Sequence, residues 1–404
     1  MDRVRKNLVV GVLHESLWGL SFALIDPITV LQLALKDLGG REALAGLFAG
    51  LLWAGLNVSQ LPAAFWLSPR FSDPRRCAAL HLPALACTAG LALAFSLGLA
   101  PAPLLRCYVV LASLFFLLIG LVVPFWIGMI SRCVPAGVRG RYFAWSFSLA
   151  NLGGIASGAL AVHWISQGGL AWGYRQTFWL ALALQLLSIS LLPLLHPLTP
   201  AEPAPGPLKP YLRAQAAQLL GNRPFQLFLL ASLAMQLASA PYNLFTDYLR
   251  QRGLPTEWWA WLNAAKNIGG VLGSFLMGYL ADHQGPRFSL GAAFAMMAAS
   301  LLLLPLPAPA ASLGAFLGGG FFASAYPVIN LYVLLLLAKP GQTTALAGTF
   351  AAISAPLVFG APWLSGWLAQ RYGYAACLGL ALTACAGGLL FVWRTRSFGI
   401  KEAS

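Results

Sequence analysis

Long apolar stretches follow one another along almost the whole chain of 404 residues, and only short polar connections separate them. A helix of about 20 residues is long enough to cross the ~30 Å hydrocarbon core of a bilayer. Lipid cannot hydrogen-bond open backbone groups, so each stretch is predicted to be a helix. The fold class is therefore an all-α polytopic membrane protein with twelve transmembrane helices, predicted at 8–35, 43–66, 78–99, 104–130, 142–166, 176–196, 225–248, 257–281, 288–306, 311–337, 345–369 and 375–393.

The composition agrees with a membrane protein. Hydrophobic residues make up 59% of the chain and charged residues 9%, whereas about a quarter of a soluble domain is charged. The net charge of +14 comes from basic residues between apolar stretches, a pattern typical of membrane flanks rather than of nucleic-acid binding. The six cysteines form no C-x-x-C pair, so neither a disulfide framework nor a metal site is expected.

The distribution of basic residues predicts the orientation. With twelve spans both termini lie on one side, and 17 of the 25 Lys and Arg residues fall on that side against seven on the other. The positive-inside rule then places both termini in the cytoplasm. The first apolar stretch continues to about Leu35, which is too long for a cleavable signal peptide. The expected location is the inner (cytoplasmic) membrane of a bacterial cell.

The longest connection, 197–224, is expected to be a cytoplasmic linker between two six-helix bundles, 1–196 and 225–404. It begins with a proline-rich segment and continues into Lys209–Leu220, which is predicted to be a short amphipathic helix on the membrane surface. The halves show a weak internal repeat, of the kind from which many transporters are built. The repeated positions are Pro27 and Pro241, Leu67 and Leu280, Pro124 and Pro327, and Ala144 and Ala347.

The turn after the eighth span, at 278–287, reads GYLADHQGPR. It can be an ordinary polar turn, but it resembles the G-x-L-A-D-x-x-G-x-R loop of the major facilitator superfamily. Asp282 can bind neighbouring helix ends and arginines, and glycine permits a tight turn. The resemblance implies two pseudo-symmetric six-helix bundles and a gating loop that contains Gly278, Asp282, Gly285 and Arg287.

Two further loops resemble this family less closely. The first-half copy at 67–76 keeps Arg70, but Pro69 stands where the family has aspartate, and Asp73 can substitute only from a shifted position. The loop 135–141 is similar to the family's P-x-x-x-R-G-R pattern, with Arg139 and Arg141 in the basic positions. Span five lacks the G-P pair of drug–proton antiporters, which disfavours that subclass without excluding it.

Two carboxylates lie in the first span. Glu15 and Asp26 share one helix face and are ~16 Å apart along the axis. Asp26 precedes Pro27, which can kink the helix and free a carbonyl group. A carboxylate at this depth is expected to face the protein interior, either as a proton or cation site or as half of a structural ion pair. His14, about 100° around the helix from Glu15, is either functional or a packing residue.

Lys266 is the basic residue near the middle of a span, and Asn263 and Asn267 flank it. A buried ammonium group needs compensation. Asp26 or Glu15 can provide it, as can an anionic substrate, and the ion pair is slightly favoured because the chain offers two buried carboxylates. The remaining alternative is a lysine that reaches water.

Other polar side chains within the spans are candidates for a substrate site. Asparagine and glutamine are costly in lipid, so they either line a cavity or join helices. Asp247 belongs either to this group or to a solvated span end. The substrate candidates are Gln236, Asn243, Tyr326, Asn330 and Trp126, the last of which can stack on a substrate.

These features favour a secondary active transporter that moves a small organic solute by alternating access, with H⁺ as the expected coupling ion. No nucleotide-binding loop, metal-ligand cluster or nucleophile constellation is visible in the sequence, so neither a cofactor nor an enzyme activity is expected. A functional monomer in the lipid bilayer is expected, with no nucleic-acid partner. An efflux antiporter of the same superfamily, an intramembrane transferase and a non-transporting receptor remain alternatives.

Overall fold

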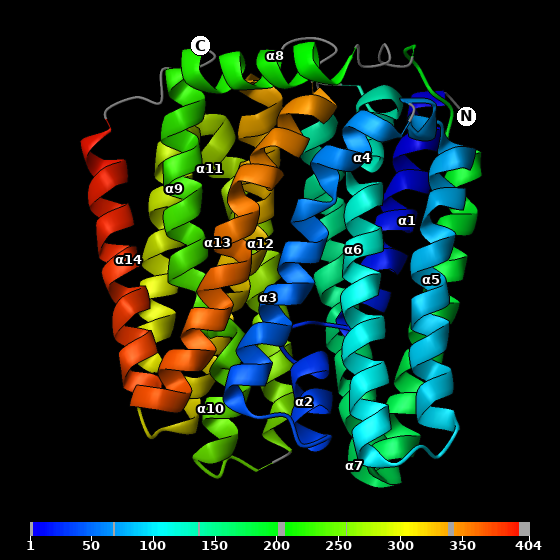
Figure 1. Ribbon diagram of the computed structural model, residues 1–404. Helices are drawn as coiled ribbons and strands as arrows, with labels where there is room; N and C mark the ends of the chain where they lie inside the picture. Colours follow the sequence, from blue (N-terminus) through cyan, green and yellow to red (C-terminus); the bar gives the residue numbers. More distant parts are fainter. Residues whose placement is uncertain are drawn as a thin grey trace.

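The computed structural model describes residues 3–67, 69–135, 138–200, 207–255, 257–337 and 343–395. This part of the chain is almost entirely helical, and most helices run side by side along one axis (Figure 1). The α-helices are α1 (Arg3–Leu24), α2 (Val30–Asp37), α3 (Glu42–Val58), α4 (Gln60–Trp66), α5 (Pro74–Ser96), α6 (Pro101–Cys133), α7 (Arg139–Leu191), α8 (Leu208–Gly221), α9 (Arg223–Ser239), α10 (Phe245–Gln251), α11 (Trp258–Leu303), α12 (Pro309–Leu337), α13 (Thr343–Tyr372) and α14 (Tyr374–Arg394). Short 3₁₀ turns are η1 (Pro69–Ser72), η3 (Leu192–Leu194) and η4 (Ala240–Leu244).

The predicted twelve-helix fold class is confirmed. Ten segments of the described chain are long and apolar enough to cross a membrane, and Arg287–Leu303 is a shorter apolar helix. The long helix α7 contains two of the ten, Trp145–Gly168 and Ala171–Leu194. The backbone stays helical between these two segments, yet the chain reverses there. The close approach of the two segments shows the reversal, since a Cβ on Gly173 would touch the backbone of Ile165.

Helix α11 reverses in the same way and supplies the predicted spans 257–281 and 288–306. Gly269 lies against Leu317 of α12, and Gly318 of α12 lies against Met296. In a straight helix residues 269 and 296 would be ~40 Å apart along the axis. Both nevertheless contact the same turn of α12, so the chain must turn back between them.

The first span is not one kinked helix, as the sequence suggested, but two helices. It stops after Leu24 and resumes at Val30. Pro27 has no N–H, and the carboxylate of Asp26 accepts the backbone N–H groups of Ile28 and Thr29, so the break is hydrogen-bonded internally. The expected kink is replaced by a full break because this side chain satisfies the freed donors.

The seventh span has a matching interruption. Helix α9 ends at Ser239, and η4 separates it from α10. Pro241 lies in η4, so the repeated prolines Pro27 and Pro241 mark the same feature in two places of the chain. Discontinuous helices of this kind bring backbone groups and polar side chains to mid-membrane depth in transporters.

The predicted surface helix is also present, as α8, and it lies across the end of the bundle where α1 begins and α14 ends (Figure 1). The buried hydrophobic residues form clusters that follow the chain. The largest comes mainly from 225–392, and the other two come mainly from the first 195 residues. The boundaries 1–196, 197–224 and 225–404 remain a prediction.

Candidate functional site

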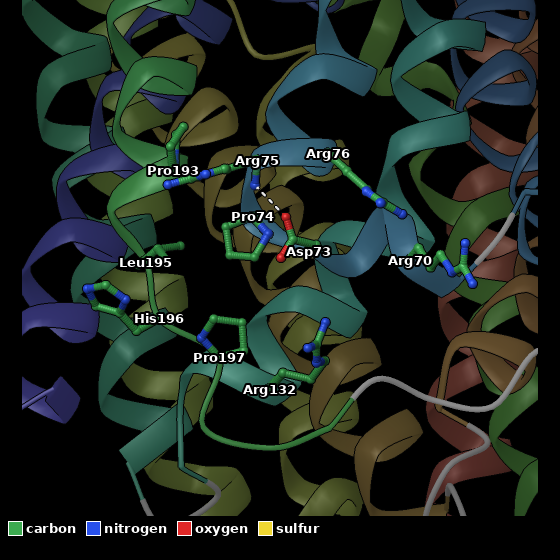
Figure 2. Close-up of a pocket in the computed structure, with 10 residues that line it drawn as sticks. All are labelled: Arg70, Asp73, Pro74, Arg75, Arg76, Arg132, Pro193, Leu195, His196 and Pro197. Atoms are coloured by element: carbon green, nitrogen blue, oxygen red, sulfur yellow. Dashed lines mark hydrogen bonds between the residues drawn. The ribbon is translucent and has the colours of Figure 1, made fainter.

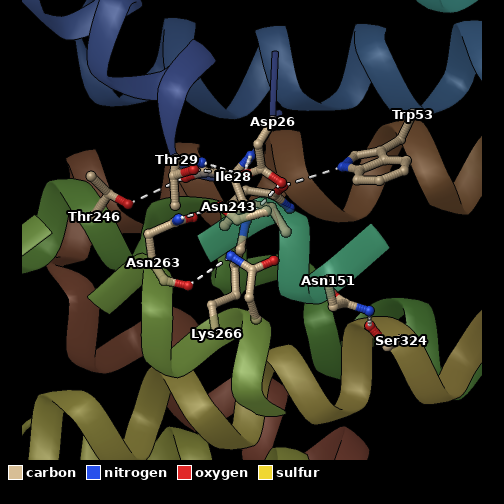
Figure 3. A network of polar contacts seen from close by, with 12 residues as sticks. Asp26, Ile28, Thr29, Trp53, Asn151, Asn243, Thr246, Asn263, Lys266 and Ser324 are labelled. Carbon is tan, nitrogen blue, oxygen red and sulfur yellow. Dashed lines mark hydrogen bonds and ion pairs between the residues drawn. The ribbon is translucent and has the colours of Figure 1, made fainter. Parts of the chain in front are cut away.

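An ion pair joins the break in the first span to the middle of α11. Nζ of Lys266 lies 2.9 Å from Oδ2 of Asp26, and both residues are buried, with exposed fractions of 7% and 8%. The predicted contact between Lys266 and a first-span carboxylate is therefore present, and Asp26 rather than Glu15 makes it (Figure 3).

The two oxygens of Asp26 have different partners. Oδ1 accepts hydrogen bonds from the backbone N–H of Ile28 at 3.0 Å, and from the N–H and hydroxyl of Thr29 at 2.8 Å each. Oδ2 faces Lys266. One atom of the carboxylate thus holds the helix break in shape while the other carries the ion pair, so a change at Lys266 need not disturb the break.

The two broken spans meet beside this ion pair. The hydroxyl of Thr246, in α10, donates to the carbonyl of Ile28 at 3.2 Å, and Nε1 of Trp53 donates to Oδ1 of Asn243 at 3.2 Å (Figure 3). Both bonds connect residues that are about 200 positions apart in the chain. The predicted substrate residue Asn243 is thus at the centre, bonded to a tryptophan of α3.

The asparagines beside Lys266 face α7. Nδ2 of Asn263 donates to the carbonyl of Gly154 at 3.1 Å, and Nδ2 of Asn267 donates to the carbonyl of Asn263 at 2.8 Å. A Cβ on Gly158 would overlap with Asn263, so glycine at that position permits the close approach of α7 and α11. The proline-free stretch of span five therefore forms a tight helix contact next to the ion pair.

Glu15 forms a separate polar site within the first half of the chain. Its Oε1 accepts hydrogen bonds from Nε1 of Trp126 at 2.5 Å and from the hydroxyl of Tyr142 at 3.2 Å, and it lies 3.8 Å from Nε2 of His14. The indole N–H of Trp126 is thus directed to Glu15, and its stacking on a substrate stays a prediction. His14 is held by the backbone carbonyl and the hydroxyl of Ser188.

The remaining candidates join α9 to α12. Nε2 of Gln236 donates to the hydroxyl of Tyr326 at 2.9 Å, and the hydroxyl of Ser232 lies 3.4 Å from Oδ1 of Asn330. These contacts agree with the alternative that polar side chains in the spans connect helices. Their role in substrate binding stays a prediction.

A network of charges at the end opposite the termini was missed. Lys36 of α2 lies 3.0 Å from Asp247 of α10 and 3.6 Å from Glu42, while Arg250 of α10 lies 2.8 Å from Asp37. The hydroxyl of Tyr374 also donates to Asp247, which is buried rather than a solvated span end. We call this set the outer network, after the predicted orientation. A signal was available, because Asp37 and Arg250 are separated by 213 positions, close to the spacing of the repeated residues.

We expect the outer network to hold that end closed. The background variant replaces the exposed Cys107 with serine and the buried Gln32 with a reporter cysteine. Adding Lys36→Gln should make this reporter react about tenfold faster with an impermeant maleimide. The reason is that losing a buried ion pair costs at least ~1.4 kcal/mol, which favours opening of that end. Arg250→Gln should act more weakly, since its pair is half-exposed. Arg41→Gln is the control, an exposed cation at the same end outside these pairs. Equal rates in all variants would contradict the assignment.

Some predicted gating residues can be placed. Asp73 accepts the N–H of Arg75 at 3.1 Å and caps α5, and Arg287 donates to the carbonyls of Val392 and Trp393 at the end of α14. Arg70 lies in η1, and Asp73 directly follows that turn. The side chains of Asp282, Arg139 and Arg141, and the surroundings of Gly278 and Gly285, lie outside what the structure describes.

Within the described residues, no group of three His, Cys, Asp or Glu side chains is placed to hold a metal ion. All six cysteines are free thiols, and five of them are buried. What the centre offers chemically is therefore a carboxylate, an ammonium group and amide side chains, which can exchange a proton and bind a polar solute.

Comparisons with known proteins agree with this architecture. A family model described as Major Facilitator Superfamily matches residues 16–357. The fold is similar to a partially occluded inward-open conformation of the xylose transporter XylE from E. coli, with a TM-score of 0.69 and 15% identity over 98% of each chain. It is also similar to a D-xylose-proton symporter, with a TM-score of 0.66 and 16% identity over 97% of this chain and 98% of that one. None of the curated proteins matches the sequence.

Proposed function

The chain belongs to the Major Facilitator Superfamily, and we propose that it is a proton-coupled secondary transporter that moves a small organic solute across the cytoplasmic membrane by alternating access. The observation that carries this proposal is the buried ion pair between Asp26 and Lys266. It lies where the two interrupted spans meet, which is the place at which a proton and a solute can both influence how the two predicted bundles pack together (Figure 3).

The proposed coupling uses the charge of Asp26. A proton on its carboxylate would remove the attraction to Lys266, which holds the first span against α11. The desolvated ammonium group would then favour an arrangement that gives it water or an anionic group of the solute. Because a bound proton stabilises one arrangement over the other, it shifts the balance between the two access states. The outer network would oppose opening at its own end until that balance changes.

Unpaired polar atoms support a polar solute. Within the described residues, the hydroxyl of Tyr242 and Oδ1 of Asn263 are buried without a hydrogen-bond partner. Tyr242 adjoins Asn243 in η4, and Asn263 is one turn from Lys266. A buried polar group without a partner costs about 1–3 kcal/mol. A solute that carries hydroxyl groups would satisfy both atoms, since a hydroxyl can donate to Oδ1 of Asn263 and can accept from or donate to the hydroxyl of Tyr242.

Flux into proteoliposomes tests the function. A thermal-shift screen of sugars, polyols, organic acids and known efflux substrates identifies ligands, since binding raises the melting temperature. A stabilising ligand should then cross the membrane of proteoliposomes that contain the protein, faster under a proton gradient. Flux in the direction of the gradient indicates symport, and flux against it indicates the efflux antiporter. Ligand binding without any flux would leave only the receptor alternative, and turnover of the ligand would indicate an enzyme.

The proposed orientation has a separate test. We expect both termini and the segment 197–224 to lie in the cytoplasm, because basic residues are concentrated at that end of the spans. A reporter that is active only in the cytoplasm should be active when fused after Ser404 and inactive when inserted in the turn at Gly39–Gly40. The opposite pattern would reverse the orientation.

A further inference from the structure

A cavity opens at the end of the bundle where the chain begins. Its volume is about 530 Å³, and it lies between η1, the start of α5, the end of α6 and the segment after η3 (Figure 2). It is separate from the ion pair at the centre. The residues that line it are Arg70, Asp73, Pro74, Arg75, Arg76, Arg132, Pro193, Leu195, His196 and Pro197.

The charge of this cavity is strongly positive. Four arginines line it against the single carboxylate of Asp73. In Figure 2, Arg75 and Arg132 lie on either side of Asp73. Oδ1 of that carboxylate already accepts the N–H of Arg75 as a helix cap. At the rim, Nζ of Lys6 lies 3.0 Å from Nε2 of His196 and adds a further cation.

Three of these arginines, Arg75, Arg76 and Arg132, are not neutralised by the described protein groups. No ion pair between described residues includes Arg75, Arg76 or Arg132. Arg132 donates to the backbone carbonyls of Ser72 and Thr199, both at 3.1 Å. These bonds fix the direction of its guanidinium group without cancelling its charge. The cavity thus presents one positioned guanidinium group, that of Arg132, beside the exposed side chains of Arg75 and Arg76, and guanidinium groups bind phosphate oxygens with favourable geometry.

The position of the cavity relative to the membrane indicates where the phosphate comes from. One membrane-crossing segment starts at Pro74 and another ends at Leu194, and both residues adjoin the cavity. The cavity is therefore at the level where a bilayer has its headgroups. Leu194 and Leu198 are next in the chain to lining residues, have exposed fractions of 45% and 37%, and offer an apolar surface to an acyl chain.

We propose that this cavity binds the phosphate of an anionic phospholipid headgroup, with Arg75, Arg76 and Arg132 as the phosphate ligands and Leu194 and Leu198 against the acyl chains. A soluble phosphate ester shares the headgroup chemistry but has no use for the exposed leucines. The site differs from the proposed solute and proton site in position and in chemistry, so it can be tested without knowing the solute.

The test uses the full-length protein in detergent, titrated with phosphatidylglycerol and, separately, with phosphatidylcholine, inorganic phosphate and glycerol phosphate. Native mass spectrometry counts bound lipids, and thermal unfolding follows their effect. We expect phosphatidylglycerol to bind and raise the melting temperature far more than the other three. Arg75→Gln/Arg76→Gln should weaken that binding at least about tenfold, because a hydrogen bond to a charged group contributes ~1.5–3 kcal/mol.

The matched control is Arg3→Gln/Arg5→Gln, which removes the same charge from equally exposed arginines that lie at the same end of the bundle but do not line the cavity. It should leave phosphatidylglycerol binding within about twofold of the unaltered protein, since exposed charges outside the cavity contribute little. Equal losses in both double variants would show that any basic surface suffices and would overturn the proposal. So would equal stabilisation by inorganic phosphate or by phosphatidylcholine. The lipid comparison on the unaltered protein decides the matter even where a variant fails to fold.

Discussion

Asp26→Asn should abolish accumulation of the solute against its gradient and leave exchange of solute across the membrane detectable. An amide oxygen at the Oδ1 position can still accept the N–H groups of Ile28 and Thr29, so the break in the first span should keep its shape. At the Oδ2 position an amide N–H₂ would face Lys266 in place of the charge. The substitution keeps the hydrogen bonds of the break but removes the ionisable group and its ion pair, so a proton gradient can no longer drive transport.

Uptake driven by an imposed proton gradient and counterflow without one are measured on the same proteoliposomes. Glu257→Gln is the matched control, because Glu257 is an exposed carboxylate that lies outside both the centre and the outer network. Thr29→Val is a second control that removes one hydrogen bond to Asp26 while the carboxylate stays. Gradient-driven accumulation at the unaltered level in Asp26→Asn would refute the coupling role. Loss of both activities would point to a structural role instead.

The fold could be predicted from the sequence because lipid imposes few solutions. Apolar length alone located the spans, and a backbone in hydrocarbon must be helical. The reversals inside α7 and α11 were also located, at 167–175 and 282–287, because polar residues and glycines interrupt the apolar pattern there, but the helical backbone of these connecting residues was not foreseen. The break at Pro27 was underestimated for a different reason. A proline predicts a kink, but the full interruption depends on a carboxylate that accepts the freed backbone groups.

The candidate site could be predicted only in part. The partnership of Lys266 with a first-span carboxylate follows from the cost of burying a lone charge, but the choice of Asp26 over Glu15 does not. Glu15 is on the same helix face, and it is the hydrogen bonds from Trp126 and Tyr142 that satisfy it elsewhere. The outer network escaped notice because charges near span ends are commonly solvated. Only the packing of α2 against α10 shows that the largely buried side chain of Lys36 meets the buried Asp247.

Replacing Lys266 tests the ion pair from its other side, and the expected effect is large. Lys266→Gln should lower the unfolding free energy by about 3 kcal/mol, because removing one partner leaves a buried carboxylate without its countercharge. Asp26→Asn should destabilise the protein by a similar amount for the converse reason. Removing both charges in one protein should restore part of the loss, since no unpaired charge then remains. The restored part is the coupling energy of the double-mutant cycle.

Thermal unfolding in detergent gives the stability of the unaltered protein, the two single variants and the double variant. Lys209→Gln on α8 is the control for loss of an exposed lysine. If Lys266 instead serves an anionic solute, Lys266→Gln should fold as stably as the unaltered protein and lose ligand binding, and Asp26→Asn should restore nothing. Lys266→Leu distinguishes the first two alternatives, the ion pair and the contact with an anionic solute, from the third, in which the lysine reaches water. A leucine at this position creates no charge and packs well, so a melting temperature and transport rate equal to those of the unaltered protein would rule out the ion pair and the solute contact together. The 2.9 Å distance to Asp26 and the exposed fraction of 7% argue that this will not be the outcome.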